Sequence, residues 1–254
     1  TATVRAERLS DLNLPPLTED RIAVLPGGLA ILAELLEVFE IKGLRAAEGG
    51  LREGLLYDMV GRITNEDVRV RSVRAMARRF HVDGEQAERV AKTAAELLSQ
   101  VRGAWGLEDP LAELMLGWAA ELHEVGLDIS HSRYHLHGAY LVENADMPGF
   151  AREEQQLLAA LIRGHRRRVV LDRLEELLSP WDTRAEYMIV LLRIAVLLHR
   201  GREETTHDVK AVARARTLTL EFPPKWLGEH PLTAADLLQE AEYLRPHEFR
   251  LRVI

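Results

Sequence analysis

The segment of residues 187–198, YMIVLLRIAVLL, constrains the fold more than any other part of the sequence. Arg193 is its single charged residue, and the others are apolar or aromatic. A helix that is apolar on nearly every side has to be buried, and twelve residues are too few to span a bilayer, which takes about 20. The segment therefore predicts the buried central helix of an all-helical domain, with Asp182 as its N-cap.

Helical spacing of apolar residues predicts further helices on both sides of this segment. We expect one from an Asn65 N-cap to about Phe80, one capped by Asp83, one from Pro110 to His123, and a short one over residues 171–178. Residues 103–110 are expected to form a loop. Nearer the N-terminus, residues 21–26 suit a strand or a helix lead-in. Gly27 and Gly28 are expected to open a helix, where they form a turn or present amides to a phosphate.

The C-terminal residues have a different pattern. RTLTLEF (216–222) and FRLRVI (249–254) alternate like strands, and ADLLQEAEYL (235–244) between them has helical spacing. The tail therefore predicts a small strand–helix–strand unit. We find no internal repeat and no low-complexity segment.

Composition limits the classes of function. The formal net charge is -7 and there are no cysteines, which excludes disulfides, thiolate zinc sites and cysteine nucleophiles. The acidic balance disfavours general nucleic-acid binding, so an anion would have to be held by a local positive patch. The N-terminus has no apolar signal core. These features predict a cytoplasmic protein with no membrane association.

Residues 123–168 hold the strongest functional signal. This stretch contains half of the chain's ten histidines together with six arginines. Histidine with nearby carboxylates suits metal binding, whereas histidine with arginine suits oxyanions, because guanidinium groups match phosphate oxygens. A second group of arginines, at positions 69, 71, 74, 78 and 79, forms a solvated helix face or an anion-facing stripe.

The pair His123-Glu124 at a helix end, inside a helical domain, has the layout of HD-type metal phosphohydrolases. Such a site also needs a histidine from an earlier helix and an aspartate from a later one. Here those positions hold Gln86 and Val196, and Glu124 replaces the usual aspartate, so we do not expect an HD metal centre. The remaining metal alternative uses His123, Glu124, His137 and His165. In the structural interpretation, His123 caps the helix or bonds within the core, and His137-Gly138 allows close helix packing.

Five motifs in this order resemble the exopolyphosphatase / guanosine pentaphosphate phosphohydrolase family. They are LPGGLAIL, GLREGLL, LHEVGLDISHSRYHLHGAYLVENADMPGF, IRGHRRR and LLRIAVLLHRGR, and together they extend over most of the chain. The resemblance implies a mainly α fold in three parts. Residues 1–62 would be the tail of a second actin-like (α/β) lobe, residues 63–205 an HD-like helical domain, and residues 206–254 a small C-terminal α/β unit.

The resemblance also implies which activity to expect. The phosphate-gripping loops and the catalytic glutamate of the family lie in lobes outside this chain, so we expect no catalytic residue here, and Thr1 in place of methionine favours a fragment. The whole protein would use Mg²⁺ to release phosphate from polyphosphate or guanosine pentaphosphate, two substrates that share a terminal phosphoanhydride. No cofactor is expected for this chain, and a homodimer is.

In the family the helical domain guides a polyphosphate chain toward the active cleft. The matching residues here are His131, His135, Arg163, His165, Arg166 and Arg167, with Arg133 and Arg168 as weaker candidates. Two rival hypotheses remain open. One is an autonomous HD-type metal-dependent phosphohydrolase, and the other is a non-catalytic dimerisation or regulatory module.

Overall fold

The computed structural model describes residues 19–41, 54, 56, 67–167, 174–203 and 208–254. The chain forms two compact units, Thr1–Ala47 and Glu48–Ile254. In the first unit, α2 (Glu19–Val38) is one continuous helix that contains Pro26. The expectation that Gly27 and Gly28 open a helix is therefore wrong, because both lie in the interior of α2. Amides in a helix interior are not presented at a helix start, which removes the phosphate interpretation of this pair.

Three helices of the second unit start at an acidic cap. Asp67, Asp83 and Asp109 each accept a hydrogen bond from a backbone amide in the first turn of α4, α5 and α6, respectively. The helical elements are α4 (Val68–Arg79), α5 (Gly84–Trp105), α6 (Pro110–Leu122), η2 (Val125–Asp128), α7 (Tyr134–Asn144), α8 (Arg152–Gly164) and α9 (Trp181–Leu198).

Several predicted boundaries are confirmed and others need correction. Asp83 and Pro110 start helices as expected. Helix α4 begins at Val68 with Asp67 as its N-cap, whereas the predicted cap, Asn65, lies outside the described residues. Helix α5 continues to Trp105, three residues into the predicted loop. The described part of the predicted helix over 171–178, residues 174–178, forms turns instead.

Helix α9 confirms the interpretation of the apolar segment. Its side chains from Met188 to Ala195 are all buried, and they belong to one continuous core with α4 to α8. The predicted cap is wrong in detail. Asp182 lies inside the first turn, and the helix starts one residue earlier, at Trp181.

The C-terminal residues form a three-stranded sheet with a helical crossover. The elements are β1 (Lys210–Arg214), β2 (Thr217–Glu221), α10 (Trp226–Glu229), α11 (Pro231–Leu244), η3 (Arg245–His247) and β3 (Arg250–Val253). β1 pairs antiparallel with β2, and β2 pairs parallel with β3. The predicted strand–helix–strand unit is confirmed for β2, α11 and β3, and β1 is an additional strand.

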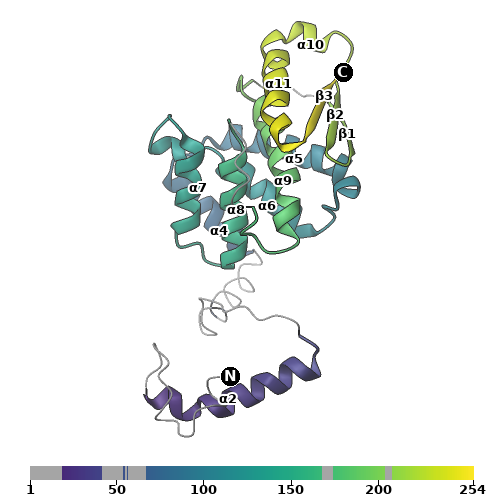
Figure 1. The fold of residues 1–254 in the computed structure, drawn as a ribbon. Helices are drawn as coiled ribbons and strands as arrows, with labels where there is room; N and C mark the ends of the chain where they lie inside the picture. The colour runs from purple at the N-terminus through teal and green to yellow at the C-terminus, as the bar shows by residue number, and fades with distance from the viewer. Residues whose placement is uncertain (1–18, 42–53, 55, 57–66, 168–173, 204–207) are drawn as a thin grey trace. The chain divides into compact units, whose positions relative to one another are not determined.

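The sheet is a layer on the helical domain. Figure 1 shows it beside α5 and α9. Leu218, Leu220 and Phe249 are buried in the same core as these two helices. α11 lies beside α9 and closes one side of the pocket described below. Within the described ranges, no helix combines the length and the apolar character that crossing a bilayer requires.

Candidate anion-binding site

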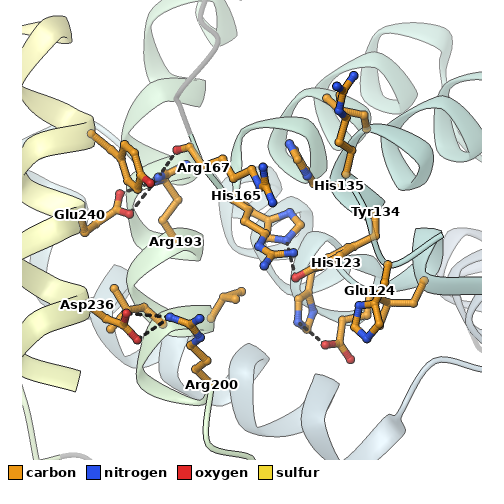
Figure 2. A pocket seen from close by; sticks show the side chains of 18 of the residues that line it. His123, Glu124, Tyr134, His135, His165, Arg167, Arg193, Arg200, Asp236 and Glu240 are labelled. Carbon is orange, nitrogen blue, oxygen red and sulfur yellow. Dashed lines mark hydrogen bonds and ion pairs between the residues drawn. The ribbon is translucent and has the colours of Figure 1, made fainter. Parts of the chain in front are cut away.

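A pocket of about 1060 Å³ opens where α11 faces the start of α7 and the end of α8 (Figure 2). We call it the His/Arg pocket. The residues that carry its chemistry are His123, Glu124, His131, Arg133, Tyr134, His135, His165, Arg166, Arg167, Arg193, Arg200, Arg202, Asp236 and Glu240. The pocket thus collects side chains from five helical elements, α5, η2, α7, α9 and α11, and from the segments between helices.

Two glycines let the backbone around His123 approach α7. A Cβ at Gly126 would lie 2.0 Å from the carbonyl oxygen of Tyr134 and 2.5 Å from the amide nitrogen of Gly138. A Cβ on Gly138 itself would meet side chains of Val125 and Ile162 at 3.0 and 3.2 Å. The predicted close packing at Gly138 is confirmed. It places the turn after α6 directly against the first turns of α7.

Three buried imidazole rings form the floor of the pocket. His123 and His165 have ring centroids 5.6 Å apart, and His165 and His135 have centroids 6.1 Å apart. His123 Nδ1 lies 2.7 Å from the carbonyl oxygen of Ala120, and His165 Nδ1 lies 2.6 Å from that of Ile162. A carbonyl accepts only, so both Nδ1 atoms carry a proton and donate it. Each neutral ring therefore turns a lone pair on Nε2 toward the pocket.

Burial keeps all three rings neutral. It lowers the pKa of His123 and lowers that of His165 well below the ordinary value. Burial, followed by the nearby positive charges of Arg166 and Arg167, lowers the pKa of His135 to about 4. A neutral imidazole is a weaker partner for an anion than an imidazolium. The charge that could attract an anion at neutral pH therefore resides on the arginines.

Three of the pocket arginines are already bound to carboxylates. Arg200 contacts both oxygens of Asp236 at 2.7 Å, and Arg202 donates to Glu124 at 2.6 Å and to Asp83 at 2.6 Å. Arg193 is buried and forms a two-point ion pair with Glu240 on α11. Within each pair the two charges neutralise one another, and the three pairs fix the walls of the pocket.

Arg193 also holds the segment that follows α8. It donates to the carbonyl oxygens of Gly164 at 2.7 Å and of Arg167 at 2.6 Å. The short stretch from Gly164 to Arg167 carries His165 and Arg166 between these two anchors. One buried guanidinium therefore connects α9, α11 and the basic turn after α8 (Figure 2).

The other three pocket arginines, Arg133, Arg166 and Arg167, have no carboxylate partner among the described residues. The guanidinium of Arg166 lies 4.8 Å from the centre of the Tyr134 ring, a stacked cation–π arrangement. Arg133 and Arg167 adopt the left-handed backbone region, with φ of 58° and 61°. That region costs a residue other than glycine about 1 kcal/mol, and such local strain is common at functional sites.

The residues at the HD metal positions do not fit a metal ion. Gln86 donates its amide to the carbonyl of His199 at 2.8 Å and accepts from Arg89 at 3.1 Å. Glu124 is bound by Arg202, and Val196 offers no ligand atom. Across the described ranges, no group of three or more His, Asp and Glu side chains has an arrangement that could hold a metal. The carboxylate of Glu124, which a metal would need as a ligand, is thus paired with the guanidinium of Arg202 instead.

The structure brings together most of the residues that the sequence singled out. His131, His135, His165, Arg166, Arg167 and Arg133 line the pocket. Arg163 does not line it, and its guanidinium lies 4.0 Å from Glu143. His137 is also absent from the lining, so the alternative metal site of His123, Glu124, His137 and His165 is not assembled. Arg168 lies outside the described residues.

Sequence reasoning missed six of the residues that carry the pocket's chemistry: Tyr134, Arg193, Arg200, Arg202, Asp236 and Glu240. Arg193 had a visible signal, because it is the one charge in an otherwise apolar helix and a buried charge needs a partner. Arg200 and Arg202 follow that helix directly in the motif LLRIAVLLHRGR. Their carboxylate partners, Asp236 and Glu124, lie 36 and 78 residues away, and sequence spacing does not indicate such contacts.

The fold and the pocket together define a mostly helical domain with a positively lined pocket and a small sheet. Residues 68–241 match the family model described as Ppx/GppA phosphatase, domain III, and residues 1–63 match the model of the Ppx/GppA phosphatase family. The chain belongs to the Ppx/GppA phosphatase family, as its motifs predicted. This membership relates it to the phosphoanhydride hydrolases.

A curated relative gives the extent of the similarity. The chain is 36% identical over 241 residues to a guanosine-5'-triphosphate,3'-diphosphate pyrophosphatase of Pseudoalteromonas translucida (strain TAC 125). The match covers 94% of this chain and 48% of the relative. The chain therefore spans about half the length of the curated relative that it matches.

Proposed function

We propose that this chain is the polyphosphate-guiding portion of an exopolyphosphatase-related hydrolase and that the His/Arg pocket holds the phosphate chain. The proposal divides the chain at residues 62 and 205, as the motifs suggest, and places the catalytic groups and Mg²⁺ in lobes outside it. The natural substrate is polyphosphate or guanosine pentaphosphate, which share the phosphoanhydride that the enzyme hydrolyses. A homodimer remains part of the proposal.

One observation carries this proposal: Arg133, Arg166 and Arg167 face one pocket with no carboxylate partner from the described ranges, beside three arginines that have one. Arginine forks bind phosphate oxygens with two parallel hydrogen bonds. The paired arginines fix the walls, while the remaining three supply unneutralised charge. His131 adds an exposed imidazole at the same pocket.

The buried histidines have a supporting role in this proposal. His165 donates to Ile162 and lies 3.5 Å from the Tyr134 hydroxyl through Nε2, so it orients the ring on which Arg166 stacks. His135 Nδ1 has no hydrogen-bond partner among the residues that the structure describes. A phosphate chain in the pocket favours its protonated form, because an adjacent negative charge raises the pKa of an imidazole.

The test is titration of the chain with polyphosphate at low salt, using Arg166→Ala/Arg167→Gly. Glycine suits the left-handed backbone at position 167, so this variant removes the guanidinium and relieves backbone strain. We expect at least a tenfold loss of affinity, roughly the 1.4 kcal/mol or more that charge-assisted hydrogen bonds contribute.

The matched control is Arg245→Ala/Arg250→Ala, which removes the same charge from exposed positions away from the pocket. Unchanged affinity in the pocket variant, or an equal loss in the control, would contradict the proposal. Elemental analysis of the same sample tests the rival HD-type enzyme, since stoichiometric bound metal would favour it over an anion channel.

A further inference from the structure

A second basic groove lies between α4 and the C-terminal end of α7. It has a volume of about 990 Å³, and we call it the α4 groove. Four of the residues that line it are exposed arginines. The lining also includes aromatic and polar residues, one of them an exposed tyrosine. These lining residues are Arg71, Arg74, Arg78, Arg79, Phe80, Tyr140, Asn144 and Asp146.

The arginines of the groove form one stripe. Arg71, Arg74 and Arg78 are spaced i, i+3, i+7 on a regular helix, so they share one face over about 10 Å. Arg71, Arg78 and Arg79 have no carboxylate partner in the described part of the chain. Of the described residues that line the groove, Asp146 is the one acid. The groove therefore carries a net positive charge on a chain of net charge -7.

Arg69, on the same helix, shows how a structural arginine behaves in this fold. It is bound to Asp67 at 2.8 Å and Glu154 at 2.7 Å and lies over the ring of Trp118. An arginine that stabilises the packing of this fold is thus paired with carboxylates and lies over an aromatic ring. Arg71, Arg78 and Arg79 receive no comparable set of carboxylates from the described residues, which distinguishes them from the structural position. Arg74 lies near Glu121.

The walls of the groove are held in place before any ligand arrives. Ser72 donates its hydroxyl to the carbonyl of Pro148 at 2.7 Å. Gly149 has a φ of 90°, and a Cβ there would lie 3.1 Å from the amide nitrogen of Arg69. The loop after α7 is therefore fixed against α4 by backbone contact. A preformed groove loses little entropy when it binds a ligand.

We infer that the α4 groove is a second binding site for the same phosphate-chain anion, separate from the His/Arg pocket. The inference rests on the proposed function for its choice of ligand. The two sites contact opposite ends of α7, whose eleven residues span about 16 Å. A long phosphate chain that engages both sites gains affinity through effective concentration, whereas a short one occupies each site independently.

The experiment is calorimetric titration of the full chain with tripolyphosphate and with long-chain polyphosphate. We expect two tripolyphosphate molecules per wild-type chain and one per chain of Arg71→Ala/Arg78→Ala. For the long chain, the same variant should lose about tenfold or more in affinity. Arg245→Ala/Arg250→Ala removes equal charge elsewhere and should retain both sites.

The outcomes separate this inference from the proposed function. If Arg166→Ala/Arg167→Gly retains two sites while Arg71→Ala/Arg78→Ala retains one, the groove stands and the pocket proposal fails. If Arg71→Ala/Arg78→Ala binds both ligands as the wild type does, the groove inference is overturned. Single-stranded RNA that binds the groove when tripolyphosphate does not would also overturn it, because the site would then belong to nucleic acid.

Discussion

His135 illustrates how a single residue can be correctly placed in a site and yet have an unexpected charge state. The sequence predicted an anion-binding histidine, and the structure puts it in the wall of the pocket beside several guanidinium groups. Burial and these positive neighbours favour the neutral ring. An arginine-rich stretch therefore works against the protonation of its own histidines, which sequence proximity alone does not reveal.

This charge state leads to a pH-dependent stability. Below about pH 6.5 the unfolded chain protonates His135, while the native ring, with a pKa of about 4, does not. The stability contribution of the neutral ring is thus present above pH 6.5 and is lost as the pH falls toward 4. We expect His135→Gln to lose less stability than the wild type between pH 7.5 and 5, by roughly 1 to 2 kcal/mol.

Urea unfolding at the two pH values measures this difference. His123 and His165 also have lowered pKa values, but both are present in each protein, so their contributions cancel in the comparison. Parallel loss of stability in the variant and the wild type would show that His135 is not the neutral, buried group described here.

At the scale of the element, α9 and α11 are joined by one buried ion pair. Removing Glu240 leaves the charge of Arg193 without its carboxylate in the core. We expect Glu240→Ala to lower the free energy of unfolding by roughly 3 to 5 kcal/mol. Chemical denaturation monitored by far-UV circular dichroism measures it.

A matched control lies two residues further along the same helix. Glu242 pairs with Arg245 at the exposed surface, so Glu242→Ala should change stability by less than about 1 kcal/mol. Replacing both buried partners, as in Arg193→Met/Glu240→Leu, should recover much of the loss, because no charge then remains buried. A small effect of Glu240→Ala would mean that the carbonyl oxygens of Gly164 and Arg167 suffice to hold Arg193.

The elements were predictable to the extent that their signals are local. The apolar segment around Arg193 and the caps at Asp83 and Pro110 predicted helices that the structure confirms. β1 was missed because Lys-Ala-Val-Ala-Arg has little strand propensity of its own. It is a strand because it pairs with β2 and packs on α5, and both contacts lie outside the segment.

The same limit applies to the candidate site. The stretch from His123 to Arg168 contained most of the pocket residues, since they lie close together in the chain. Which of His135 and His137 joins His123 and His165 as the third buried ring depends on the orientation of α7. The left-handed backbone of Arg133 directly precedes α7 and contributes to that orientation. A non-glycine residue in that conformation has no reliable sequence signal, so the orientation of α7 could not be predicted.

At the scale of the whole molecule, net charge and local charge oppose each other. A chain of charge -7 repels a polyanion at long range, so binding depends on short-range contacts in the two basic sites. Long-chain polyphosphate at 100 times its dissociation constant should stabilise the helical unit by about 2.7 kcal/mol. High salt should abolish the effect by screening the arginines.

Thermal unfolding followed by tryptophan fluorescence measures this stabilisation. All four tryptophans, at positions 105, 118, 181 and 226, lie in the second compact unit, so the signal reports that unit alone. Arg166→Ala/Arg167→Gly should show a smaller rise in Tm than the wild type. An equal rise in both proteins at every salt concentration would indicate stabilisation by nonspecific crowding of the chain rather than by site binding.

The contact between Gly126 and Gly138 also has a consequence for the comparison of relatives. The backbone of η2 touches that of α7 at this point, and a side chain at position 126 would overlap a carbonyl oxygen. A homologue with glycine at both positions can keep the pocket backbone whatever its histidines and arginines have become. A homologue with a larger residue at position 126 has to separate these segments. In an alignment of relatives, glycine at both positions therefore indicates that the shape of the pocket is kept, whichever ligand the pocket binds.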